Sequence, residues 1–188
     1  MSTTENLISA LEKQFQYYKQ LGDKTFVQLE DNQLFDRLVK DENSIGIIVH
    51  HLAGNMRSRW TDFLTTDGEK DFRNRDEEFE EVINTREELL EDWESGWSCL
   101  FNALASVNKE NFETLIYIRN IGHTITEAFL RQLAHYSYHI GQIVLLGKQW
   151  KGEDWKSLSI PKGQSKIYNQ EKFATQKARG HFTDEFLK

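Results

Sequence analysis

The sequence contains very little proline or cysteine, and each shortage narrows the class of fold. One proline among 188 residues favours long uninterrupted helices, because proline breaks helices and turn-rich β folds use it often. The single cysteine, Cys99, cannot form an intramolecular disulfide, so cysteine gives no sign of an oxidising compartment. We therefore expect one helical domain over residues 1–188, with its core at about 4–150 and a C-terminal extension at 151–188.

Long apolar runs and basic clusters are also missing. No apolar run reaches the roughly 18 residues needed to span a bilayer. Residues 1–15 lack the basic and apolar regions of a signal peptide. A net charge of −7 with no cluster of lysine and arginine argues against a nucleic-acid partner. These absences predict a cytoplasmic protein that binds neither membranes nor nucleic acid.

Hydrophobic periodicity and capping signals predict four long helices. Two of them, at about Thr85–Val107 and Thr124–Trp150, open with a capping box, in which threonine caps the first turn and a glutamate three residues later reaches back. The others are expected at about Thr4–Leu21, before a loop around Gly22–Lys24, and at about Ser44–Thr65. Four long helices with polar connections predict an all-α fold, a four-helix bundle.

The connections carry weaker signals. The stretch DGEKDFRNRDEEFEE, residues 67–81, is highly charged, and we expect an exposed connection with a short helix near its end. Residues Thr114–Ile118 alternate weakly between apolar and polar, which predicts a short extended piece. After Gly152 the chain becomes mostly polar.

Two histidines on the last long helix are candidate metal ligands. His135 and His139 are four residues apart, which places their Cβ atoms roughly 5–6 Å apart on one helix face. A metal ion, with Gln132 and Gln142 in the pocket or beside the ligands, would satisfy this polar stripe on an otherwise apolar helix. A stripe facing solvent would satisfy it equally well.

The second predicted helix offers a third ligand. His51 lies nearer the apolar face than His50, at the border of the core, so His51 is the better ligand and His50 is expected at the surface or an interface. His123 is expected in a loop or at the rim of a pocket, and His181 in a solvated tail. There is no H-E-x-x-H, E-x-x-H, nucleotide-binding or serine-hydrolase motif, which argues against those enzyme classes.

The segments HLAGN and HYSYHIGQI together resemble the DinB-like (YfiT-like) superfamily of metal-dependent four-helix bundles. NMRSRWTDFLTTDGEKDFRNRD and SLSIPKGQS further resemble an uncharacterised bacterial branch of it. The resemblance implies metal ligands at His51, His135 and His139, an up-down-down-up bundle, frequent dimers, and Zn²⁺ or Ni²⁺ as the metal. Three histidines also suit iron or copper, and manganese is a further alternative. Some relatives are thiol S-transferases or isomerases that use bacillithiol or mycothiol.

Three neutral imidazoles leave at least one coordination position open, which is typical of a catalytic site. We expect the ion to activate a low-molecular-weight thiol, such as bacillithiol, against a small electrophile. The alternatives are a metal-dependent hydrolase of a small substrate and a non-catalytic, metal-stabilised protein with a binding or stress-response role. The candidate pocket groups are Asn55, Arg59, Tyr138 and Gln142.

The opposite face of the last long helix is apolar and small. It carries Leu130, Ala134, Ser137, Gly141 and Val144 at a heptad-like spacing. Small side chains let another helix approach closely, so we expect either packing within the chain on both faces or a two-fold homodimer.

Overall fold

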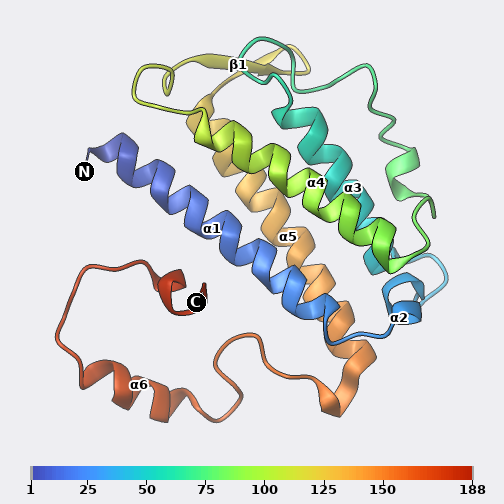
Figure 1. Ribbon diagram of the computed structural model, residues 1–188, viewed down its shortest axis with the longest axis vertical. Coiled ribbons are helices and arrows are strands. Elements are labelled where there is room, and N and C mark those ends of the chain that lie inside the picture. Colours follow the sequence, from blue (N-terminus) through green and yellow to red (C-terminus); the bar gives the residue numbers. More distant parts are fainter. Residues whose placement is uncertain (1, 188) are drawn as a thin grey trace.

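The computed structural model describes residues 2–187, and four long helices form its centre (Figure 1). These are α1 Thr3–Phe26, α3 Ile45–Trp60, α4 Arg86–Ala105 and α5 Ile125–Lys151. The shorter elements are α2 Asp31–Phe35, η1 Glu77–Phe79, β1 Leu115–Ile118, β2 Ile121–Thr124, η2 Gly152–Asp154, α6 Ser165–Phe173 and η3 Phe182–Glu185. The predicted all-α fold is confirmed. No helix in the described part of the chain is both long enough and apolar enough to cross a membrane.

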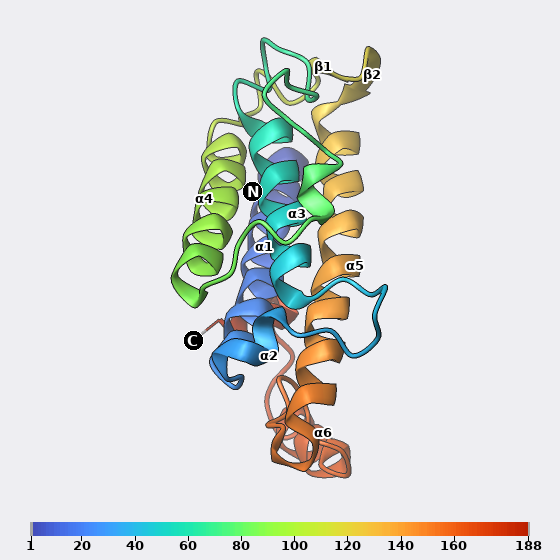
Figure 2. The ribbon, with the colours of Figure 1, turned by 90° about the vertical axis from the view of Figure 1, so that its right-hand side faces the viewer.

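The long helices pack mainly in two pairs, α1 with α5 and α3 with α4. Within each pair the helices run in the same direction, and the two pairs run in opposite directions (Figures 1 and 2). Phe15 of α1 lies at the centre, with its ring centroid 6.1–6.4 Å from those of Trp97, Phe129 and Tyr136. All four rings are buried, so one aromatic cluster joins α1, α4 and α5.

The helices begin where the capping signals predict. Thr85 accepts a hydrogen bond from the backbone of Glu88, whose side chain reaches back to complete the capping box. Thr124 and Glu127 do the same at α5. Ser44 caps α3 through the backbone N–H of Ile47. These starts are confirmed because a cap satisfies local backbone groups and needs no distant partner.

Two predicted helix ends are wrong. The loop expected around Gly22–Lys24 is helical, and α1 continues to Phe26. A Cβ atom at Gly22 would lie 2.5 Å from the Trp93 ring, so this glycine gives the indole room to pack on the helix. Helix α3 stops at Trp60 and not near Thr65, because Asp62 adopts a positive φ of 47°, which a helix cannot continue through.

The predicted extended piece is half of a hairpin. Strand β1 pairs antiparallel with β2, which the sequence did not indicate. Arg119 and Asn120 form its turn with φ of 56° and 61°, the left-handed pair that a tight two-residue hairpin requires. The Asp67 carboxylate accepts hydrogen bonds from both of their backbone N–H groups at 2.8 Å, which ties the turn to the segment after α3.

The C-terminal part of the chain returns to α1 (Figure 1). Tyr17 packs against Phe182 and Phe186, with ring centroids 5.4 and 5.5 Å away. His181, expected to be solvated, is half-buried because its Nδ1 caps η3 by accepting from the Thr183 backbone. The end of the tail, at residues 181–186, is therefore packed against α1, whereas α6 buries no residue.

Candidate metal centre

The three predicted histidines come together. His51 is buried on α3, and His135 and His139 are half-buried one turn apart on α5. One nitrogen from each ring lies within 4.8 Å of the other two, and Nε2 of His51 lies 3.3 Å from Nε2 of His135. Among residues 2–187, no other three histidine, cysteine or acidic side chains are placed to share an ion.

Oxygen acceptors fix the orientation of two of the rings. Nδ1 of His51 lies 2.9 Å from the Glu78 carboxylate, and Nδ1 of His139 lies 2.7 Å from the amide oxygen of Gln142. An ionised carboxylate and an amide oxygen can only accept, so each Nδ1 carries the proton and donates it. In the neutral ring this arrangement leaves the lone pair on Nε2, the form in which imidazole binds a metal.

His135 follows the same pattern. Its Nδ1 lies 3.4 Å from the amide oxygen of Gln132. Burial, together with the neighbouring His139 and His51, lowers its pKa to about 3. His135 is therefore neutral near pH 7, and its Nε2 also presents a lone pair.

The spacing of two of these nitrogens fits a metal ion. Two Zn–N bonds of 2.0–2.1 Å at a tetrahedral angle place the nitrogens roughly 3.3–3.4 Å apart. Nε2 of His51 and Nε2 of His135 are 3.3 Å apart. With both protons on Nδ1, the two lone pairs would repel each other unless a cation lay between them. The His51–His135 pair thus has the spacing of two ligands of one ion, and a nitrogen of His139 lies within 4.8 Å of both.

Glu78 is the charged group that holds His51. Its carboxylate takes a two-pronged ion pair from Arg73, with contacts of 2.7 and 2.9 Å. Burial alone would raise the pKa of Glu78, but the hydrogen bonds from Arg73 and His51 lower it to about 2. Gly54 makes room for this carboxylate, because a Cβ atom there would lie 2.6 Å from it.

The expectation that residues 67–81 form an exposed connection is wrong around Glu78. The side chains of Arg73 and Glu78 are only 3% and 5% exposed, since each neutralises the other. The short helix expected near the end of this segment is η1, which lies between α3 and α5 (Figure 2). Its Phe79 stacks on His51 with ring centroids 4.6 Å apart. The connection therefore forms one wall of the site.

A cavity of about 400 Å³ opens beside the three histidines. Its other lining residues are Asn55, Arg59, Arg73, Arg75, Phe79, Arg119, Arg131 and Gln132. Asn55 and Arg59 thus lie where the sequence placed them, and Gln142 supports His139. Tyr138 is wrong as a pocket group: it is 63% exposed, because it lies about 100° around the helix from His139.

A buried chain of hydrogen bonds orients Asn55. Trp60 Nε1 donates to the Tyr136 hydroxyl, which donates to the amide oxygen of Asn55, both at 3.1 Å. Within residues 2–187 the amide nitrogen of Asn55 has no acceptor. Because Asn55 lines the cavity, its amide is a donor available to a bound molecule.

The other histidines lie outside this site. Nδ1 of His50 contacts Asp92 at 2.6 Å, and Arg57 pairs with the same carboxylate, which links α3 to α4. His123 lies on β2, where its Nε2 contacts Arg131 at 3.4 Å, and it does not line the cavity. His50 thus has a structural role.

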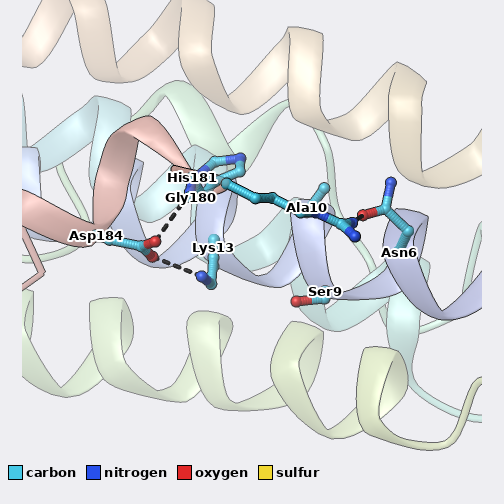
Figure 3. Close-up of a pocket in the computed structure, with 8 residues that line it drawn as sticks. Asn6, Ser9, Ala10, Lys13, Gly180, His181 and Asp184 are labelled. Atoms are coloured by element: carbon cyan, nitrogen blue, oxygen red, sulfur yellow. Dashed lines mark hydrogen bonds and ion pairs between the residues drawn. The ribbon is translucent and has the colours of Figure 1, made fainter. Parts of the chain in front are cut away.

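A second cavity of about 470 Å³ lies between α1 and the C-terminal tail (Figure 3). Its charged groups are paired across the groove, Lys13 with Asp184 at 2.5 Å, and its Arg179 donates to the side chain of Asn6 at 2.7 Å. These contacts account for its polar groups as attachments of the tail to α1.

Replacing Glu78 with glutamine should lower the free energy of unfolding of the metal-free protein by roughly 3 kcal/mol, because Arg73 loses its buried counter-charge. Glu81→Gln is the matched control: Glu81 pairs with Arg37 at 2.6 Å but is 61% exposed, so its loss should be about 0–1 kcal/mol. Urea denaturation measures both.

The pKa of Glu78 is depressed to about 2 from 4.5. The contribution of Glu78 to the free energy of unfolding should therefore be complete above pH 4.5 and disappear as the pH falls towards 2. Similar losses in the two variants would contradict this assignment.

Comparison with known proteins places the chain in a family without assigning an activity to it. No curated protein and no solved structure matches the chain. One family model, described as "Protein of unknown function (DUF1572)", matches residues 2–164. That range includes every residue of the histidine site and its cavity. The chain therefore belongs to the DUF1572 family.

Proposed function

We propose that the protein binds one divalent metal ion through Nε2 of His51, His135 and His139. The observation that carries the proposal is the convergence of three imidazole rings whose Nδ1 atoms all face oxygen acceptors. The resemblance to DinB-like proteins favours Zn²⁺ or Ni²⁺, both of which imidazole ligands suit, with iron and manganese as alternatives. Three protein ligands leave a coordination position for a substrate, and the adjoining cavity gives access to it.

We further propose that the protein is a transferase that joins a low-molecular-weight thiol to a small electrophile. The resemblance of HLAGN and HYSYHIGQI to DinB-like proteins, some of which use bacillithiol or mycothiol, supports this reaction. A divalent ion at the site supplies Lewis-acid chemistry, since it lowers the pKa of a thiol or water that binds to it. The thiol sulfur then forms the new bond to carbon, the leaving group departs with its electron pair, and the thiol proton passes to solvent.

The lining of the cavity favours a thiol over water as the nucleophile. No aspartate, glutamate or lysine lines it among residues 2–187, so a carboxylate general base of the kind zinc hydrolases use is missing. A thiol has a pKa of about 8.5 and water one of about 15.7, so the thiol needs far less help to ionise. The hydrogen bonds of Asn55 with Tyr136 and of His139 with Gln142 fix the positions of these side chains, but none of them is a general base.

The metal proposal predicts one Zn²⁺ or Ni²⁺ per chain in protein purified without an affinity tag. His51→Ala, His135→Ala and His139→Ala should each lose the ion, because two imidazoles hold it too weakly to survive purification. His50→Ala is the matched control, since His50 is adjacent in sequence but pairs with Asp92. Elemental analysis and the thermal shift on adding metal provide the measurement. A His51→Ala variant that retained a full ion would contradict the ligand set.

The transferase proposal predicts turnover of bacillithiol with monobromobimane by the metal-loaded protein. The fluorescent thioether should form faster than the uncatalysed reaction, and His135→Ala and chelator-treated protein should fall to the uncatalysed rate. Absence of metal-dependent turnover with any thiol would contradict a transferase. It would favour a hydrolase or, if His51→Ala loses only stability, a non-catalytic metal-stabilised binding protein.

We also propose a homodimer through the outer face of α5. In the single chain this face is open: Leu130 is 47% exposed, and a Cβ atom at Gly141 would meet nothing within 4 Å. Light scattering should give about twice the chain mass of 22.1 kDa for the wild type. Gly141→Trp should be monomeric, because its indole blocks close approach of a second helix while the monomer has room for it. A dimeric Gly141→Trp variant would exclude this face.

A further inference from the structure

Five arginines line the cavity beside the three histidines, although the whole chain has a net charge of −7. They come from different segments, and no acidic side chain lines the cavity with them among the described residues. We call them the arginine wall: Arg59 on α3, Arg73 and Arg75 in the connection after it, Arg119 in the hairpin turn and Arg131 on α5.

Two carboxylates behind the wall compensate only part of its charge. Glu69 contacts Arg59 at 3.1 Å and both Arg73 and Arg119 at 3.2 Å. Glu78 pairs with Arg73 and is also engaged with His51. Two negative charges against five guanidinium groups leave about three positive charges facing the cavity.

Two of the arginines have no carboxylate partner among residues 2–187. Arg75 lies over the Phe79 ring, with its guanidinium carbon 5.4 Å from the ring centroid. Arg131 contacts only Nε2 of His123, at 3.4 Å. Both side chains belong to exposed residues, so their guanidinium groups are free to meet a bound molecule.

Arg59 has an unused donor edge although its side chain is only 6% exposed. Its Nη1 donates to Gly68 and Glu69, but its buried Nε has no acceptor in the described chain and its Nη2 makes no hydrogen bond there. Arg73 uses this same Nε–Nη2 edge to hold the carboxylate of Glu78. A buried unpaired donor is costly, and at the wall of a cavity an anionic ligand would satisfy it.

We propose that the arginine wall binds a carboxylate or phosphate group of the substrate. Guanidinium groups recognise these planar or branched oxyanions with paired hydrogen bonds, and such charge-assisted bonds are strong in a partly enclosed site. The reactive end of the same molecule lies at the three histidines, a step that rests on the proposed metal site. The thiol that fits this pocket is therefore an acidic one.

Cobalt-loaded protein tests the proposal by binding alone, because the visible absorption of Co²⁺ changes when a thiol reaches the site. The probes are mercaptosuccinate, which carries two carboxylates, and neutral 2-mercaptoethanol. Mercaptosuccinate should bind roughly a hundredfold more tightly, at about tenfold per charge-assisted contact. In Arg75→Gln/Arg131→Gln the ratio of the two dissociation constants should fall towards one. Arg179→Gln is the matched control, because Arg179 lies in the tail cavity.

A second titration separates this inference from the metal proposal. Calorimetry of the metal-free protein with succinate and with inorganic phosphate measures the arginine wall without an ion, and the tighter of the two identifies the anion as carboxylate or phosphate. Both anions should bind the Arg75→Gln/Arg131→Gln variant more weakly than they bind the wild type. Failure to bind cobalt would overturn the metal site and leave this titration as the test of the wall. Equal affinity for the two thiols, with no heat from either anion, would overturn the arginine wall.

Discussion

The carboxylate of Glu78 holds together the parts of the chain that make the site. It accepts from His51 on α3 and from Arg73 in the connection, and all three side chains are almost fully buried. Neither the imidazole nor the guanidinium could be buried there at such low cost without it, because a buried polar group needs a partner. The same contact places a proton on Nδ1 of His51 and orients its ring. The folding of the connection and the orientation of His51 therefore depend on one interaction.

Sequence patterns predicted the features that depend on neighbours along the chain. The caps at Ser44, Thr85 and Thr124 satisfy backbone groups within three residues, and His135 and His139 share a face because a helix repeats every 3.6 residues. Choosing His51 over His50 also followed from helix geometry, since one residue turns the side chain by about 100°. The resemblance to DinB-like proteins agrees with that choice.

Local sequence patterns do not predict features that depend on partners far away in the chain. Residues 67–81 look like a solvated linker because charge predicts exposure, yet Arg73 and Glu78 bury each other. Phe79 of this segment stacks on His51, whereas Phe72 is 65% exposed, so an aromatic residue in the run does not by itself predict packing. The hairpin turn at Arg119 and Asn120 lacks the glycine that usually marks it, because Asp67 stabilises its left-handed backbone from elsewhere in the chain.

The charge of the whole chain and the charge of the cavity have opposite signs, and they affect different kinds of ligand. A net charge of −7 bears on long polyanions, which contact a broad surface. A small anion responds instead to the few groups within a screening length of about 8 Å, and in the cavity these are arginines. Because the five arginines come from four separate segments, only the folded chain presents them together. An acidic protein can therefore contain a cavity whose local charge is positive and attracts small anions.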